Sequence, residues 1–338
     1  MIRYSYLRAE SVEQATRELA ADARAKVIAG GTNLVDLLKY NVERPTRLVD
    51  IGRLPLDRIE ETEDGGLRVG ALVSNTDVAY NSRVEERYPL LSSTILAGAT
   101  GQLRNAATTG GNLLQRTRCY YFYDTATPCN KREPGSGCPA IHGENRILAV
   151  LGHSEQCIAT HPSDMCVALA VLEAVVRVSG PEGERAIPIG ELHRLPGDEP
   201  ERDTTLRPGE IVTAVELPPE GFAGHYTYLK LRDRRSYAFA LVSVAVGMRM
   251  EGETIAGARF ALGGVAHKPW RVPEAEAILV GERPGRDVFA AAARRALEGA
   301  IGFEHNRFKI ELAERAISRA LAQAAAGTPQ SQTDKIIR

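Results

Sequence analysis

The sequence predicts an α+β protein with more than one domain. At 338 residues the chain is long enough to form two hydrophobic cores. Short strand and helix patterns alternate near the N-terminus, whereas strand patterns follow one another between residues 210 and 262 and precede two helix patterns. Strands grouped in this way indicate an antiparallel sheet that carries helices, separate from the mixed N-terminal part.

Composition excludes several classes of protein. The formal net charge is −1, so no basic surface indicates binding to nucleic acid or to an anionic membrane. The N-terminal residues lack the apolar stretch of a signal peptide, and no run approaches the roughly 20 apolar residues of a membrane span. We expect a soluble protein without an export signal of its own.

The first region combines helix and strand patterns around a glycine turn. Ser11 and Gln14 form a predicted capping box at the start of a helix. Residues 25–29 and 47–51 are predicted strands, and the first of them ends in the turn Gly30–Asn33. These elements predict a small mixed sheet with a glycine-rich turn at the end of one strand.

The remaining elements divide the chain further. Predicted helices are 76–81, 88–97, 163–173, 287–298 and 308–324, and predicted strands are 67–72, 175–178, 210–217, 226–231, 238–250 and 256–262. The predicted segments are two subdomains at 1–55 and 56–180, an insert at about 113–160, a connection at 181–222, a C-terminal domain at 223–326 and a disordered tail at 327–338.

Two glycine turns are candidates for anion binding. Gly30–Asn33 and Thr108–Asn112 each place adjacent glycines beside Thr and Asn side chains. Backbone N–H groups in such turns can converge on a phosphate, although neither turn has the Rossmann or P-loop pattern. An ordinary tight turn is the alternative for each of them.

Taken together, the motifs resemble those of a known family. The strings that carry the resemblance are Val27–Leu34, Ile51–Gly52, Gly70–Leu72, Gly98–Asn105, Thr108–Asn112, His161–Asp164 and Lys230–Tyr237. In this order they resemble the FAD subunit of the xanthine dehydrogenase, or molybdenum hydroxylase, family over nearly the whole chain. The resemblance implies a vanillyl-alcohol-oxidase (PCMH) type FAD-binding fold, with two αβ subdomains and a C-terminal αβ domain.

The resemblance also assigns FAD-binding residues. They are Val27, Ile28, Ala29, Gly30, Gly31, Thr32, Asn33 and Leu34 at the pyrophosphate, Gly98, Ala99 and Gly101 towards the flavin, and Thr108, Gly111, Asn112, Asp164, Val212 and Lys230 around it. Asp164 would bond to cofactor hydroxyls, with helix capping as its alternative. Lys230 would lie near the isoalloxazine ring, with a solvated strand lysine as its alternative.

The cysteines are clustered in the chain. All five lie between Cys119 and Cys166, and an odd number without a signal peptide argues against a disulfide framework. Cys119, Cys129, Cys138 and Cys157 lie in the insert, whereas Cys166 falls in an apolar helix pattern and is expected to be buried. Nearby thiolates favour a metal centre, which could be an iron–sulfur cluster or zinc, and an empty loop is the alternative. The histidines of this segment, His142, His153 and His161, are expected to have ordinary loop roles or to support the metal ligands, with metal binding as the alternative.

The insert resembles that of the periplasmic aldehyde oxidoreductase branch of the family. In that branch the insert carries a [4Fe–4S] cluster, so the resemblance implies four cysteine ligands here: Cys119, Cys129, Cys138 and Cys157. It further implies electron transfer through FAD, with no catalytic residue on this chain, from a molybdenum subunit and a [2Fe–2S] subunit to an external acceptor. Xanthine or CoA-thioester substrates, a stand-alone FAD oxidase and a non-enzymatic metal-binding protein are the alternatives. The expected location is the cytoplasm, or the periplasm if a partner subunit carries the export signal.

Overall fold

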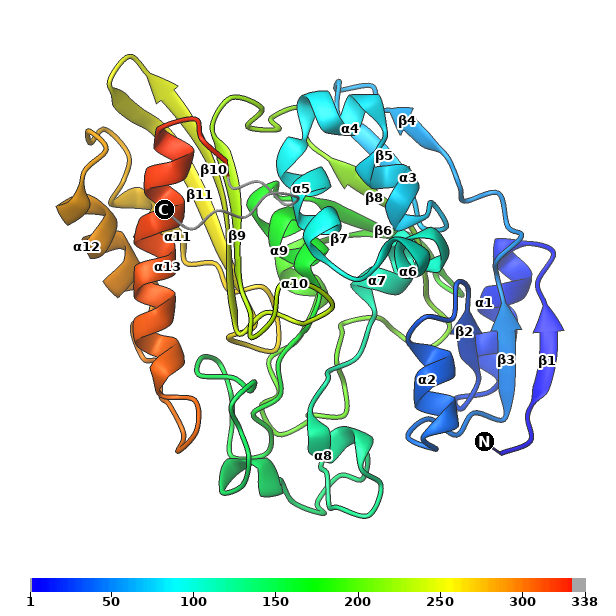
Figure 1. Cartoon of the computed structure of the whole chain (residues 1–338). Helices are drawn as coiled ribbons and strands as arrows, with labels where there is room; N and C mark the ends of the chain where they lie inside the picture. Colours follow the sequence, from blue (N-terminus) through cyan, green and yellow to red (C-terminus); the bar gives the residue numbers. More distant parts are fainter. Residues whose placement is uncertain (1, 330–338) are drawn as a thin grey trace.

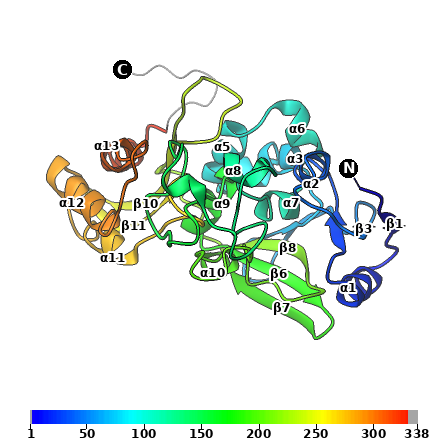
Figure 2. The ribbon, with the colours of Figure 1, turned by 90° about the horizontal axis from the view of Figure 1, so that it is seen from below.

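Three β-sheets, each with its own helices, follow one another along the chain (Figure 1). Residues 2–329 are described here from a computed structural model. Seen from below, the three units stand in a row, with the N-terminal sheet at one end and α12 and α13 at the other (Figure 2). The expected α+β architecture is confirmed, and the predicted tail lies mostly outside the described residues.

The N-terminal sheet is fully parallel, so the predicted mixed sheet is wrong. Its strands are β1 (Ser5–Arg8), β3 (Arg47–Asp50) and β2 (Lys26–Ile28), in that spatial order. Helices α1 (Val12–Ala21) and α2 (Leu34–Lys39) form the two connections. Each helix returns the chain to the end of the sheet where the previous strand began, which makes the next strand parallel.

The capping box at the start of α1 is present in a shifted form. The Ser11 hydroxyl accepts a hydrogen bond from the Gln14 N–H, and the Gln14 side chain accepts one from the N–H of Glu10 rather than of Ser11. Two N–H groups at the helix start are thereby satisfied.

The central sheet has five antiparallel strands in the order β4-β5-β8-β6-β7. Strand β8 comes from the segment 181–222 and lies in the middle of the sheet. The strands are β4 (Ile59–Glu61), β5 (Leu67–Gly70), β6 (Val175–Gly180), β7 (Gly183–Pro188) and β8 (Ile211–Leu217). The helices of this unit are α3 (Asn75–Ala79), α4 (Ser82–Arg87), α5 (Pro89–Ala97), α6 (Gly101–Ala106), α7 (Thr109–Leu113), α9 (Asp164–Val171) and α10 (Ile189–Leu192).

The C-terminal sheet is antiparallel and covered on both faces. Its strands are β9 (Tyr226–Leu231), β10 (Val242–Glu251) and β11 (Thr254–Gly263), in the order β11-β10-β9. Helix α13 (Phe308–Ala325) packs on one face, while α5 and α9 pack on the other. Helices α11 (Pro273–Ala277) and α12 (Arg286–Ala296) extend the outer core. The sheet therefore joins two hydrophobic cores.

The cysteine loop (residues 113–160) connects α7 to α9 and lies below the sheets in the view of Figure 1. It contains only the short helix α8 (Tyr120–Tyr123) and one 3-10 turn (Pro139–Ile141). A small hydrophobic cluster of its own includes Phe122, Leu148 and Ile158. No helix among residues 2–329 is both long and apolar enough to cross a membrane.

Candidate functional site

The two glycine turns face each other across a cavity of about 160 Å³, called here the glycine cavity. One wall is the run from Val27 to Leu34, which leaves β2 and enters α2. The opposite wall contains Thr108 and Gly111 at the start of α7, and Val212 of β8 closes one side. The cavity thus lies between the N-terminal and central sheets.

Glycine is required at the first turn because the two units approach each other closely there. A Cβ on Gly30 would lie 1.7 Å from the carbonyl oxygen of Ala106, and Gly31 has a φ of +71°. Across the cavity the segment predicted as a turn forms the short helix α7, because the Thr108 hydroxyl accepts a hydrogen bond of 3.2 Å from the Gly111 N–H. The wall therefore has no side chain at Gly30 and Gly31, whereas apolar side chains such as Ile28, Leu34 and Val212 line other parts of the cavity.

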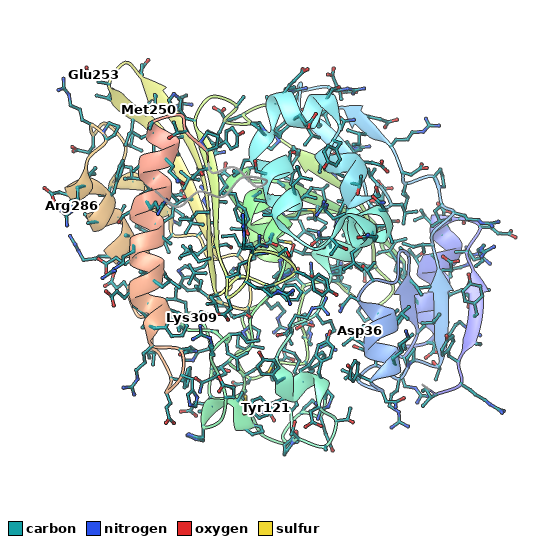
Figure 3. The ribbon with its side chains drawn as sticks, in the orientation of Figure 1. Asp36, Tyr121, Met250, Glu253, Arg286 and Lys309 are labelled. Carbon is teal, nitrogen blue, oxygen red and sulfur yellow. The ribbon has the colours of Figure 1, made fainter. Side chains whose placement is uncertain are left out.

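A second cavity of about 450 Å³, called here the lysine cavity, continues from the first. The two share Thr32, Asn33 and Gly111 in their linings. The lysine cavity also reaches Asp36 on α2, which Figure 3 labels at the edge of the N-terminal unit. Residues expected from the sequence that line it are Gly98, Ala99, Asn112, Asp164 and Lys230. Together the cavities form one elongated space that suits a dinucleotide.

Lys230 is buried in an ion pair rather than solvated on its strand. Its side chain is 1% exposed, and Nζ lies 2.7 Å from Oδ2 of Asp164. Tyr228 donates a hydrogen bond to Oδ1 of the same carboxylate. Burial and the nearby Asp164 charge raise the pKa of Tyr228 well above its usual value, so it stays a protonated donor. The pair is close to neutral, which reduces the positive charge that Lys230 presents to the cavity.

The wall near this pair is strained at one residue. Ala99 has a φ of +51°, in the left-handed region that non-glycine residues rarely adopt. Lys230 and Arg232 both donate to the carbonyl of Ala97, and Arg104 donates to the carbonyl of Gly98, which holds the strained segment in place. Strain of this kind is often found where a ligand is bound.

Four buried polar atoms on the lysine cavity have no partner among residues 2–329. They are Asn33 Nδ2, Asn75 Oδ1, Arg104 Nε and Arg118 Nε. Buried polar groups are normally hydrogen-bonded, so these atoms fit the polar groups of a bound ligand. The sequence did not single out Asn75, Arg104 or Arg118 for this role. Conversely, Gly101, expected near the flavin, begins α6 and lines neither cavity.

The four cysteines expected as ligands surround one small cavity in the cysteine loop. Cys119, Cys129, Cys138 and Cys157 all line it, although they are separated along the chain. Burial and neighbouring thiols raise the pKa of Cys119 to about 12. The hydrogen bond that Cys157 donates to Cys138, together with burial, raises the pKa of Cys157 to about 12, and the same bond lowers the pKa of Cys138. Such thiols become thiolates only when a cationic centre stabilises them.

The four sulfurs do not form a compact group. Among the described residues, the only group of three or more potential ligands within 4.8 Å of one another lies elsewhere, so no three of these sulfurs are that close. A single zinc ion holds thiolates about 3.8 Å apart, given its Zn–S distance of roughly 2.3 Å. An iron–sulfur core is larger and separates its thiolates more widely.

The basic residues that neighbour the cysteines in the sequence form ion pairs and hydrogen bonds with oxygen atoms rather than with the cysteines. Arg116 pairs with Glu43 of the N-terminal unit and with Asp203, and Lys131 pairs with the same Asp203 carboxylate at 2.6 Å. Arg132 donates to backbone carbonyls within the loop. These side chains therefore fasten the loop to its surroundings. Asp203, which comes from the segment after α10, was not indicated by any sequence pattern.

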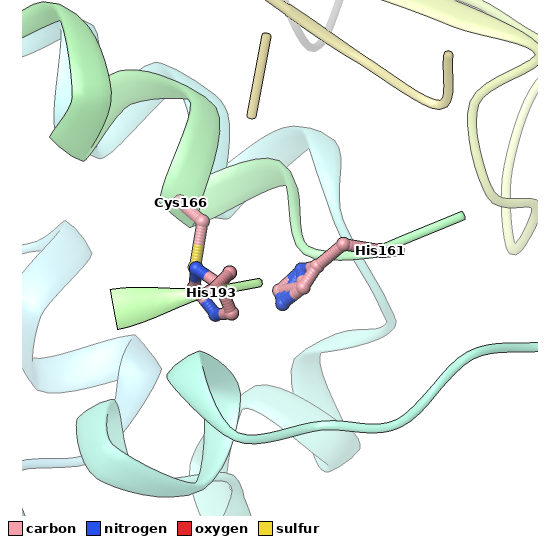
Figure 4. Close-up of side chains that lie close together, drawn as sticks. All are labelled: His161, Cys166 and His193. Atoms are coloured by element: carbon pink, nitrogen blue, oxygen red, sulfur yellow. The ribbon is translucent and has the colours of Figure 1, made fainter. Parts of the chain in front are cut away.

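Cys166 is fully buried on α9, as the sequence predicts, but it is not isolated. His161, Cys166 and His193 have ligand atoms that all lie within 4.8 Å of one another. Figure 4 shows the three side chains converging from α9, from the chain before it and from the segment after α10. From the sequence, His161 was expected to have an ordinary loop role or to support metal ligands, and His193 was not singled out.

Comparison with known proteins identifies the two parts of the chain. A family profile described as the FAD binding domain in molybdopterin dehydrogenase matches residues 2–220. A second profile, described as the CO dehydrogenase flavoprotein C-terminal domain, matches residues 226–324. The aldehyde oxidoreductase FAD-binding subunit PaoB of Escherichia coli strain K12 is 51% identical over 328 residues, which cover 96% of this chain and 99% of that protein.

Solved structures share the fold over the same length. Carbon monoxide dehydrogenase from Hydrogenophaga pseudoflava matches with a TM-score of 0.76 and 26% identity, covering 97% of this chain and 100% of the other. Quinoline 2-oxidoreductase from Pseudomonas putida 86 matches with a TM-score of 0.74 and 26% identity, covering 96% and 98%.

Proposed function

Because the chain belongs to the FAD-binding subunits of the molybdenum hydroxylase family, we propose that it carries FAD and a [4Fe–4S] cluster in an aldehyde oxidoreductase complex. The observation that carries the FAD assignment is the continuity of the glycine and lysine cavities through Thr32, Asn33 and Gly111. The aldehyde assignment is supported by the 51% identity to a subunit named for that activity.

In this proposal the main chain holds the pyrophosphate. The N–H groups of Thr109, Gly110 and Gly111 at the start of α7 donate to protein oxygens, whereas residues of the Gly30–Asn33 turn line the glycine cavity and offer the turn's N–H groups. Such groups bind phosphate oxygens without a cationic side chain, as at other glycine-rich anion sites. The unpartnered Asn33 and Asn75 side chains offer one donor and one acceptor to the rest of the ligand.

Asp164 and Lys230 have complementary tasks at the lysine cavity. Asp164 accepts hydrogen bonds from Tyr228 and Lys230 and retains further acceptor capacity for a ligand hydroxyl. Lys230 remains a buried cation held 2.7 Å from that carboxylate, which fixes its position relative to the flavin. When bound, FAD supplies electron transfer at this site, and these residues orient it and set its electrostatic surroundings.

The cluster assignment is supported by the four cysteines around one cavity. Cys119, Cys129, Cys138 and Cys157 would hold it. Relatives are named as medium chains or medium subunits, which supports an assembly with further subunits. We propose that these partners carry molybdenum and [2Fe–2S] centres. We propose that the chain receives electrons from these partners and delivers them to an external acceptor.

The test is a cofactor assay on the anaerobically purified chain. FAD, iron and acid-labile sulfide are measured per polypeptide together with the visible spectrum. One FAD with about four iron and four sulfide supports the full proposal. Flavin without iron in folded protein removes the cluster and leaves the FAD subunit, whereas absence of flavin contradicts the central assignment. Oxidation of aldehydes by the assembled complex, compared with xanthine, tests the substrate class.

A further inference from the structure

His161, Cys166 and His193 form a compact group of potential metal ligands outside both proposed cofactor sites. Their ligand atoms lie within 4.8 Å of one another, and Cys166 and His193 are buried. The two imidazole rings lie 4.1 Å apart between centroids. Figure 4 shows the Cys166 side chain pointing from α9 towards the rings. None of the three residues lines the cavity surrounded by the other four cysteines.

Hydrogen bonding leaves one nitrogen of each ring available. Nε2 of His193 and Nε2 of His161 lie 2.8 Å and 3.3 Å from the carbonyl oxygen of Leu113. A carbonyl oxygen only accepts, so both Nε2 atoms carry the proton that they donate. Both Nδ1 atoms are buried and have no hydrogen-bond partner among residues 2–329. In neutral rings these atoms are lone pairs without a partner, an arrangement that proteins normally avoid.

The alternative to a ligand is a protonated pair, which the surroundings disfavour. Two imidazolium rings in contact would repel each other in a buried position. One ring nitrogen of each histidine and the Cys166 sulfur lie within 4.8 Å of one another.

We propose that His161, Cys166 and His193 bind a soft d10 cation, with Cu⁺ preferred over Zn²⁺. Binding forms one metal–sulfur and two metal–nitrogen bonds and releases the thiol proton to solvent, with no change of oxidation state. Thiolate and imidazole ligands suit both ions. Cu⁺ with one thiolate gives a neutral site, whereas Zn²⁺ leaves a net positive charge that is costly to bury. The ligand atoms would draw together to roughly 3.5 Å, as metal–ligand bonds of 2.0 to 2.3 Å require.

The position of the group gives the ion a structural role. Leu113, which accepts from both rings, directly follows Asn112 of the lysine cavity. His161 and Cys166 flank Asp164, and the hydroxyl of Ser163 donates to the Asn112 side chain at 2.7 Å. An ion at this group would fasten α7, α9 and the chain after α10 beside the lysine cavity.

The test is metal analysis of the full chain purified anaerobically and treated with a chelator. Copper, zinc, iron and FAD are measured on the same samples of the wild type, Cys166→Ala, His193→Gln and Cys119→Ser. About one copper per wild-type chain, reduced roughly tenfold or more in the first two variants, is expected. Zinc that is bound by the wild type and lost in the same two variants would support the site and show that its ion is Zn²⁺ rather than Cu⁺. Metal that is absent, or unchanged in Cys166→Ala and His193→Gln, overturns the proposal.

The controls separate this site from the proposed cluster. Cys119→Ser should lose iron and keep copper, so a failure of the cluster proposal does not decide the new site. Copper lost in Cys119→Ser but kept in Cys166→Ala assigns the ion to the cysteine loop and overturns the proposal. FAD content reports folding in each variant, and His142→Ala, which removes an exposed histidine, should change no metal. Copper K-edge absorption should show nitrogen and sulfur neighbours, and a spectrum without sulfur contradicts the ligand set.

Discussion

The glycine cavity and the cysteine loop position their ligands by different means. In the glycine cavity, main-chain groups at the ends of β2 and at the start of α7 form the walls, and regular elements fix them. The cysteine loop has almost no regular structure, and side chains such as Arg116, Lys131 and Arg132 fasten its backbone. The shape of the glycine cavity therefore depends on the close approach of two backbone segments. The structure of the cysteine loop depends on its ion pairs and on its thiols.

The largest expected effect comes from removing a thiol of the loop. Cys119→Ser replaces a buried ligand by a hydroxyl, which is a poor ligand for iron. We expect loss of most of the iron, faster proteolysis within residues 113–160 and unchanged FAD. Cys166→Ala, which lies outside the loop, is the matched control and should keep its iron. Full iron content in Cys119→Ser would show that this cysteine is not a ligand.

Gly30→Ala tests the dependence of the glycine cavity on space. The added Cβ would meet the Ala106 carbonyl at 1.7 Å, so the N-terminal and central units must move apart. Overpacking of this kind costs about 1 to 3 kcal/mol, and FAD affinity should fall at least as much as stability. Thermal unfolding and FAD titration measure both effects, with iron content expected to stay constant.

Gly190→Ala is the control for that substitution. Gly190 lies in α10, and an added Cβ there would meet no atom within 4 Å. If both variants bind FAD equally well, close approach at Gly30 does not shape the cavity.

Asp203→Asn tests the charge pairs of the loop. Arg116 and Lys131 hold the pKa of Asp203 well below its usual value, even though burial opposes this. The carboxylate therefore contributes stability that is present above its unfolded pKa of about 4 and is lost as pH falls through the lower folded value. We expect a loss of roughly 1 to 3 kcal/mol at neutral pH, reduced because the side chain is 32% exposed.

The effect should decrease towards acidic pH, where the wild type also protonates. Urea unfolding followed at several pH values measures it. Glu199→Gln, which removes an exposed ion pair near the same segment, should have little effect. A constant difference between wild type and Asp203→Asn across the acidic range would contradict the charge argument.

Local signals explain which features the sequence could predict. The glycine segments Gly30–Asn33 and Thr108–Asn112 are marked by neighbouring residues, and the structure places both on the glycine cavity, although the second forms the short helix α7 rather than a turn. The parallel N-terminal sheet was missed because β1 is a four-residue strand with mostly exposed side chains. Period-two burial is absent there, so no pattern marks it.

Asp203 and His193 were missed for a different reason. Both follow α10 in an irregular segment, and they meet Lys131 and His161 only through the tertiary fold. Spacing along one chain cannot reveal such contacts, whereas the cysteines were noticed because they are rare and clustered. Lys230 shows the same limit, since its strand pattern did not reveal the ion pair with Asp164.

The smallest expected effect concerns Lys309, which joins the C-terminal helix to the end of the cysteine loop. It lies near the start of α13 (Figure 3), is fully buried and donates to the carbonyls of Leu148 and Gly264. Burial lowers its pKa to about 7. Since the unfolded side chain titrates near 10.4, the unfolded state binds more protons above pH 7, and stability should rise with pH by about 1 kcal/mol between pH 7 and 8.

Lys309→Met should remove this rise because methionine does not titrate. Its absolute stability should also fall, since the two carbonyls lose their donor. Chemical unfolding of both proteins at closely spaced pH values isolates the contribution, because the buried thiols titrate in both and cancel in the difference. Parallel pH profiles for the two proteins would mean that Lys309 stays charged in the folded state. A buried cation would then hold the cysteine loop at Leu148, as Lys131 does at Asp203.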